Sequence, residues 1–491
     1  MSREQSLLAS TVALLEWDEE TYMPAAGVEL RSEQLAFLAG LQHDRATDPR
    51  IGELLSVLEG SDLVSDPTSV PAVNVREMRY DYERDTRMPR ALAAELARTT
   101  ALAHQEWVAA RQDADFTRFR PWLDRIVSLK RNEAEAIGYT REPYDALLDE
   151  HEPGMTTADI AMLFTSIRED LVPLVADLRD AEGQHSDGIL HRDFPVDRQR
   201  VLAEGVAASL GFDRGAGRFD TSAHPFCSGI GPGDCRITLR FRAHDLSEGL
   251  FGVLHETGHA LYDQGLDPAH HGTPMGEPAS LGIHESQSRL WENLVGRSAA
   301  FWEYLSPRLR DLFHETLPDA NALELFRAAN RVGASANRVR ADQVTYNLHV
   351  IIRFEIERGL IAGDLAAGDV PAAWNEGYRR YLGITPDDDA AGCLQDMHWA
   401  SGLIGYFPTY TLGDVFAAQL FAAASSELGD LEGLMRRGDF RPLLDWLRRT
   451  VHRQGRRYRG AELVQRATGR PPDPRLLTSA LRQKFGELYG L

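Results

Sequence analysis

The chain has 491 residues, of which 43% are hydrophobic and 26% charged, an ordinary composition for a large globular protein. Its formal net charge of −21 repels phosphate backbones and disfavours nucleic acid as a partner. Three cysteines without repeated spacing, Cys227, Cys235 and Cys393, do not make a disulfide framework and indicate a reducing compartment. No signal-peptide core is present and no window approaches about 18 uninterrupted apolar residues, so we expect a cytoplasmic protein without a membrane partner.

Helix-like periodicity dominates the chain, because apolar residues recur three and four positions apart. The clearest helical blocks are residues 89–112, 119–137, 157–181, 196–210, 322–362 and 414–427. Prolines and glycines fall mainly between these blocks. No stretch has the composition of a linker, so we expect one domain over residues 1–491 rather than the roughly three that length alone suggests.

Strand signals are few and gather near the middle of the chain. Residues 236–242 (RITLRFR) alternate between apolar and polar with period two. The glycine-rich residues 229–233 before them are typical of a hairpin turn. The sequence therefore predicts a mainly α fold, one large helical body with a small β-element near residues 226–242.

The strongest chemical motif lies directly after that β-element, at residues 251–262 (FGVLHETGHALY). On a helix, His255 and His259 lie one turn apart on the same face, so both imidazoles can bind one metal ion. Glu256 is rotated by about 100° from His255 and flanks the ion without having to ligate it. This arrangement suits a base that takes a proton from an activated water.

The flanks of the motif also favour a helix. Asp245 or Ser247 can cap its first turn, and residues 265–268 (GLDP) can end it. Two histidines at this spacing can also be plain core residues, so the motif alone does not establish a metal site. A catalytic zinc site needs a third protein ligand and one open position.

The best source of that third ligand is residues 283–292 (IHESQSRLWE), which are helical in pattern. An antiparallel neighbour of the first helix could place Glu285 against the two histidines. His284 and Glu292 are rival ligands by chemistry alone. Otherwise, His284 is a surface or supporting group, and Glu292 is the partner of a ligand histidine or a nearby arginine.

Several further stretches make the chain resemble the carboxypeptidase Taq family of metallocarboxypeptidases, over nearly its whole length. In chain order, the stretches that carry the resemblance are residues 16–24 (EWDEETYMP), 224–226 (HPF), 234–238 (DCRIT), 255–259 (HETGH), 284–287 (HESQ), 341–349 (ADQVTYNLH), 392–399 (GCLQDMHW) and 405–413 (GYFPTYTLG). Independent motifs in family order are far more specific than the central motif alone.

The resemblance implies a mostly helical peptidase with a deep active-site groove that removes residues one at a time from free C-termini of peptides. It further implies broad side-chain tolerance, a divalent metal (Zn²⁺, with Co²⁺ able to substitute) and a homodimer. Carried over to this chain, the ligands are His255, His259 and Glu285, and Glu256 is the catalytic base.

Such a mechanism needs a donor for the oxyanion that forms when water attacks the peptide carbonyl. Tyr410 and His224 are the candidates because both lie in family-like stretches, with core packing as the alternative for each. Glu256 takes the proton of the water and returns it to the leaving amine.

An exopeptidase also needs a group that recognises the terminal carboxylate, which arginine does best through a bidentate fork. Arg236 and Arg338 are the candidates, with a structural ion pair to a nearby acid as the alternative for each. Asp396 and His398 are expected at the end of the substrate groove, or else as a buried structural pair.

Two other functions compete with this interpretation. A helical oligopeptidase would share the metal site but lack the carboxylate clamp. A non-catalytic scaffold would carry a degenerate site, although all three expected ligands and the base are present in this chain.

Overall fold

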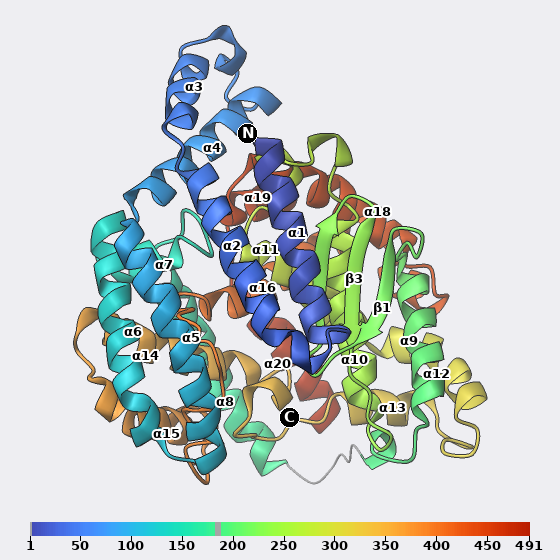
Figure 1. Ribbon diagram of the computed structural model, residues 1–491. Helices are drawn as coiled ribbons and strands as arrows, with labels where there is room; N and C mark the ends of the chain where they lie inside the picture. Colours follow the sequence, from blue (N-terminus) through green and yellow to red (C-terminus); the bar gives the residue numbers. More distant parts are fainter. Residues whose placement is uncertain (1, 182–187) are drawn as a thin grey trace. The chain divides into compact units, whose positions relative to one another are not determined.

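The computed structural model describes residues 2–181 and 188–491 (Figure 1). Helices make up most of it, with one small sheet, which confirms the mainly α fold and the β-element near residues 226–242. The backbone contacts divide the chain into two compact units. Unit 1 consists of residues 1–86, 186–329 and 417–471, and unit 2 of residues 87–185, 330–416 and 472–491. The single domain and the groove expected from the sequence stay predictions.

Unit 1 contains the sheet and the helices around it. Its elements are α1 (Ser2–Thr21), α2 (Val28–Ala46), α3 (Pro49–Glu59), α4 (Val70–Arg87, up to its last residue), α9 (Val196–Leu210), β1 (Gly217–Thr221), β2 (Phe226–Gly231), β3 (Asp234–Leu239), α10 (Leu246–Asp263), α11 (Leu281–Arg289), a π-helical turn (Leu290–Val295), α12 (Ala299–Leu312), α13 (Ala322–Ala329), α17 (Leu431–Arg436), α18 (Arg441–Thr450) and α19 (Gly460–Thr468). Its core includes three fully buried tryptophans, Trp291, Trp302 and Trp446.

The sheet has the order β1-β3-β2, with β1 parallel and β2 antiparallel to β3. The predicted hairpin turn is present, and Gly233 takes a positive φ of 82° at its tip. The register pairs Cys227 with Ile237 and Gly229 with Cys235, and it becomes irregular directly after Gly229. Strand β1 lies outside the predicted β-element.

Helix α10 carries the central motif and packs against β2 and β3, as can be followed in Figure 1. It begins where the sequence indicated, because the Asp245 side chain accepts hydrogen bonds from the amides of Ser247 and Glu248. Leu250, Val253, Leu254 and Leu261 form part of its buried side, which anchors the helix to unit 1.

Unit 2 is built almost entirely from helices, and α5 and α6 pack as a neighbouring pair in it (Figure 1). Its elements are α5 (Arg90–Asp113), α6 (Phe116–Ile137), α7 (Tyr144–Leu148), α8 (Thr157–Asp180), a 3₁₀ turn (Arg338–Arg340), α14 (Tyr346–Ala362), α15 (Val370–Leu382) and α20 (Arg475–Tyr489). Helix α16 (Pro408–Leu428) contributes residues to both units. Among the described residues, no helix combines the length and apolar character needed to cross a membrane.

One predicted helix is wrong, because residues 322–362 are not continuous. They form α13 and α14, separated by residues 330–345 with only a 3₁₀ turn between them. The Asn337 side chain accepts from the amide of Val339, and Asp342 accepts from the amides of Val344 and Thr345. These short polar side chains satisfy backbone donors locally and so compete with the helix.

Helix α14 also carries a fully buried acid, Glu357. Its carboxylate accepts hydrogen bonds from the Tyr144 hydroxyl (2.7 Å), the Trp399 indole N–H (2.9 Å) and the Gly405 amide (3.1 Å). Burial raises the pKa of Glu357 to about 7 in spite of these donors. Glu357 thereby ties two family-like stretches, residues 392–399 and 405–413, to α14.

Candidate metal centre

The centre begins with the two histidines of α10, whose rings lie 4.9 Å apart between centroids. Their Nε2 atoms both face one carboxylate oxygen on α11. Oε2 of Glu285 is 3.4 Å from Nε2 of His259 and 3.8 Å from Nε2 of His255. Ligands about 2.0–2.2 Å from a tetrahedral zinc ion are separated by roughly 3.3–3.6 Å. Both separations are close to these values, and the three residues form one of two candidate metal-ligand groups in the described part of the chain, with all ligand atoms within 4.8 Å of one another.

Helices α10 and α11 approach closely because the motif has a glycine at position 258. A Cβ atom there would lie 2.6 Å from the backbone carbonyl oxygen of Gln287 and 2.6 Å from Cα of Ser288. Any larger residue would push the two helices apart. Ser280 caps α11 by accepting from the amide of Ile283, which fixes where the helix starts.

Each histidine is oriented by a hydrogen bond at its other ring nitrogen. Nδ1 of His255 lies 2.9 Å from Oε2 of Glu292, and Nδ1 of His259 lies 3.1 Å from the backbone carbonyl oxygen of His284. Both partners accept, so each Nδ1 donates and Nε2 is the ring nitrogen left for a metal. Burial lowers the pKa of His255, but Glu285 and Glu292 outweigh it and raise the pKa to about 9, so a metal ion would displace a proton from Nε2 of His255. Glu292 stands in the π-helical turn, an irregularity that is frequent at functional sites.

The side chain of His284 contacts two residues of α10. Its Nδ1 lies 2.7 Å from Nδ1 of His259, and its Nε2 lies 3.0 Å from Oδ1 of Asp263. Of the acids and histidines considered for the third ligand, only Glu285 faces both Nε2 atoms. His284 and Glu292 contact the Nδ1 side of the rings.

Arg289 compensates for the negative charge of the two glutamates. Its Nε donates to Oε1 of Glu285 at 2.6 Å, and its Nη1 lies 3.5 Å from Oε2 of Glu292. Burial raises the pKa of Glu285, but Arg289 and His255 oppose it so strongly that the pKa falls well below the usual value. Burial also raises the pKa of Glu292, but the hydrogen bond with His255 and the charge of Arg289 outweigh it and lower the pKa to about 2. Both carboxylates are therefore ionised at neutral pH.

Glu256 is 7% exposed and lies next to His255 in the motif. Burial raises its pKa to about 7, with a further contribution from Glu285 and an opposing one from His255. A carboxyl group that titrates near neutral pH can both accept and return a proton.

The other two candidate residues of unit 1 lie on the sheet side. The side chain of His224 is exposed, in the connection between β1 and β2. Arg236 on β3 forms a two-point ion pair with Asp234, with both N–O distances 2.8 Å, and its guanidinium lies 4.2 Å from the centroid of the Trp17 ring. The guanidinium of Arg236 is thus in contact with both a carboxylate and an aromatic ring.

The remaining candidates belong to unit 2 and form a cluster of their own. Arg338 donates from Nη2 to Oδ1 of Asp396 at 2.8 Å, and Arg353 donates from Nε to Oδ2 at 2.6 Å. One carboxylate is therefore shared by two guanidinium groups. Nε2 of His398 lies 3.0 Å from the hydroxyl of Tyr410, and burial lowers the pKa of His398 to about 3, so its ring is neutral.

Sequence reasoning missed Arg289 and Arg353. Arg289 follows Glu285 by four residues, and this i, i+4 spacing was a usable signal for an ion pair. Arg353 gave no such signal, because its partner Asp396 is 43 residues further along the chain.

A helix with two histidines and a glutamate, together with an acid on the neighbouring helix, is the pattern typical of a metal-dependent peptidase. Comparison with known proteins agrees. Residues 1–485 match the family described as carboxypeptidase Taq (M32) metallopeptidase. This chain belongs to that family, which confirms the prediction of a metallocarboxypeptidase.

Individual relatives extend over nearly the whole chain. Thermostable carboxypeptidase 1 of Thermus thermophilus is 47% identical, covering 99% of this chain and 97% of its own. Carboxypeptidase 1 of Bacillus subtilis is 36% identical, with 98% and 96% covered. The crystal structure of the M32 carboxypeptidase from Deinococcus radiodurans matches with a TM-score of 0.96 and 41% identity, covering 100% of this chain and 98% of that one.

Proposed function

We propose that this carboxypeptidase releases single residues from the free C-terminus of peptides with broad specificity, with Zn²⁺ held by His255, His259 and Glu285 and with Glu256 as the general base. The observation that carries the proposal is the convergence of both Nε2 atoms on Oε2 of Glu285, at 3.4 and 3.8 Å. Two imidazoles and a carboxylate suit zinc, and Co²⁺ has similar ligand preferences.

The bound ion supplies Lewis acidity that makes a water nucleophilic near neutral pH. The chain's own part is to hold and move the proton. Glu256 accepts it from the attacking water and returns it to the leaving amine, a role supported by its place next to His255 in the motif. Glu292 keeps the proton of His255 on Nδ1, so that Nε2 stays available to the ion.

For recognition of the terminal carboxylate, we favour Arg338 over Arg236. Asp396 is shared between Arg338 and Arg353, so this cluster keeps a net positive charge with which to attract an anion. Arg236 is matched one to one by Asp234 and stacks on an aromatic ring. In this proposal Asp396 orients Arg338 for the substrate.

Tyr410 and His224 are proposed as donors to the oxyanion of the reacting carbonyl. Tyr410 is supported by its hydrogen bond with the neutral ring of His398, which can orient the hydroxyl. His224 is supported by the exposure of its ring, which leaves it accessible to a ligand.

The test is mass spectrometry of one short peptide, as the free acid and as the C-terminal amide, incubated with the zinc-loaded protein. A ladder of C-terminal losses from the free acid alone, absent with Glu256→Gln, is the expected result. Internal cuts in both peptides would favour the oligopeptidase instead. A metal-loaded protein that cleaves neither peptide would favour the scaffold.

Three finer properties complete the proposal: zinc as the resident ion, a homodimer and a cytoplasmic location. The sparse cysteines support a reducing compartment. Elemental analysis of the purified protein tests the ion, and sedimentation equilibrium tests the dimer.

A further inference from the structure

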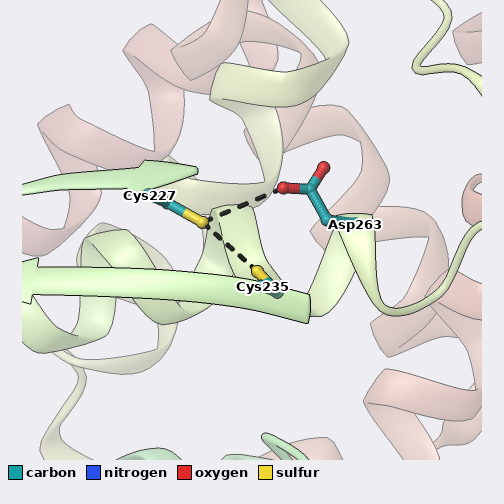
Figure 2. Close-up of side chains that lie close together, drawn as sticks. All are labelled: Cys227, Cys235 and Asp263. Carbon is teal, nitrogen blue, oxygen red and sulfur yellow. Dashed lines mark hydrogen bonds between the residues drawn. The ribbon is translucent and has the colours of Figure 1, made fainter. Parts of the chain in front are cut away.

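A second group of side chains that could hold a metal ion lies at the C-terminal end of α10 (Figure 2). It consists of Cys227 on β2, Cys235 on β3 and Asp263, the last residue of α10. The two Sγ atoms are 3.6 Å apart, and Sγ of Cys227 lies 3.8 Å from Oδ2 of Asp263. All three ligand atoms fall within 4.8 Å of one another. None of the three side chains has a part in the proposed peptidase chemistry.

These separations match a cation site more closely than a disulfide. Zinc–sulfur bonds of about 2.3 Å and zinc–oxygen bonds of about 2.0–2.2 Å place tetrahedral ligands roughly 3.5–3.8 Å apart. A disulfide needs its sulfur atoms about 2.05 Å apart and its Cα atoms within about 7 Å. The strand register makes Cys227 and Cys235 diagonal neighbours, a position in which residues are typically about 7–8 Å apart.

The surroundings leave room for the acid beside the hairpin. A Cβ atom on Gly229 would lie 2.8 Å from Oδ2 of Asp263, so a larger residue there would displace this carboxylate from its place beside β2. Cys235 is buried, whereas Cys227 is partly exposed and gives an ion a path from solvent. The site thus combines a buried ligand, Cys235, with a partly exposed one, Cys227.

We propose that Cys227, Cys235 and Asp263 form a second cation site, selective for a thiophilic divalent ion such as Zn²⁺, with solvent in the remaining position. Two thiolates and one carboxylate favour zinc, cadmium or cobalt over magnesium or calcium, which prefer oxygen ligands. On binding, each thiol releases its proton to solvent and its sulfur forms a bond to the ion.

The site would join the β2–β3 hairpin to the helix that carries the first metal centre. Asp263 follows His259 by four residues, so both lie on one face of α10. While Oδ2 faces the thiols, Oδ1 holds Nε2 of His284 at 3.0 Å, and Nδ1 of His284 lies 2.7 Å from His259. A cation at the cysteines would therefore hold Asp263 in place. Through Asp263 it would also position His284, which contacts His259 of the first centre.

The test is a Co²⁺ titration of the fully reduced protein without oxygen, followed by absorption spectroscopy. We expect a thiolate-to-cobalt charge-transfer band and one more bound equivalent of metal than in the Cys227→Ser/Cys235→Ser double variant. Cys393→Ser, which removes the buried thiol of unit 2, is the matched control and should keep both the band and the extra equivalent. His255→Ala should lose the other equivalent and keep the band.

A wild-type protein without the band would overturn the proposal, as would a band that persists in the double variant. If the double variant folds poorly, Cd²⁺ binding to the wild type replaces it. Thiolate-to-cadmium absorption should then appear together with loss of thiol reactivity at the accessible Cys227, mapped by alkylation and mass spectrometry. Alkylation of Cys227 that Cd²⁺ leaves unchanged would reject the site.

Discussion

Two buried glutamates, Glu256 on α10 and Glu357 on α14, have a pKa raised to about 7, and burial is the main cause for both. Their surroundings differ. Glu256 keeps 7% exposure and lies beside three candidate metal ligands, whereas Glu357 is fully buried and receives three hydrogen bonds from its own unit. A raised pKa therefore does not by itself mark a catalytic group. What separates the two acids is whether a substrate can reach them and what stands next to them.

The largest expected effect is a difference in peptidase activity between variants of these two acids. Glu256→Gln should lower kcat by about 10²- to 10⁴-fold, because the amide cannot accept the proton of the attacking water. Its metal content should stay at the wild-type level, since the proposed ligands are untouched. Glu357→Gln, measured in the same assay below its melting temperature, should keep kcat within a few-fold. Equal losses in the two variants would contradict the assignment of Glu256 as the base.

The next effect compares the arginines of the two units. Arg338→Ala should lower kcat/KM for free-acid peptides by about 10- to 100-fold, the range expected when a charged hydrogen bond is lost. Most of the change should be in KM, because the carboxylate is bound in the ground state as well. Arg236→Ala serves as the matched control and should change kcat/KM far less. A larger loss of kcat/KM in Arg236→Ala than in Arg338→Ala would indicate that Arg236 binds the terminal carboxylate instead.

A smaller effect tests the close contact of α10 and α11. Gly258→Ala should lower the free energy of unfolding by about 1–3 kcal/mol, since the new Cβ meets backbone atoms that cannot turn aside. It should also weaken zinc binding, because Glu285 moves away from the histidines. Gly252→Ala on the same helix is the control. Its Cβ would meet nothing within 4 Å, so this variant should gain up to about 1 kcal/mol from helix propensity.

Sequence reasoning could group the two histidines of the first candidate centre, because they lie close together in one helix. The helical period alone brings His255 and His259 to one face, and Asp245 marks where the helix starts. The choice among His284, Glu285 and Glu292 was different. It depends on how α11 is rotated about its axis, which periodicity does not fix, and only the family resemblance favoured Glu285.

The cluster of unit 2 could not be assembled from the sequence. Arg338 and Arg353 meet at Asp396, which lies 58 and 43 residues away in the chain. Only the packing of α14 against these loops creates that contact. The break between α13 and α14 was missed for a related reason, because the capping role of Asn337 and Asp342 is weak evidence against a strong helical pattern.

The cysteine site could be predicted from the sequence only in part. The predicted turn at residues 229–233 places Cys227 and Cys235 on the two strands of one hairpin, where the register makes them diagonal neighbours. Asp263 extends the series of His255 and His259 by one further helical turn. Joining the two signals required knowing that the end of α10 packs against β2.

The smallest effect concerns pH and stability in unit 2. Folding raises the pKa of Glu357 from 4.5 to about 7, so between these values the folded chain holds a proton that the unfolded chain releases. This group therefore makes the free energy of unfolding fall as pH rises from about 4.5 to 7, by at most about 1.4 kcal/mol per pH unit, with no further contribution above that range. Glu357→Gln removes this slope and leaves the Trp399 or Gly405 donor facing an amide N–H₂. The variant should be less stable than wild type at pH 5, with a gap that narrows towards pH 7 in urea unfolding monitored by tryptophan fluorescence. A gap that stays constant across this range would mean that Glu357 is already ionised in the folded protein.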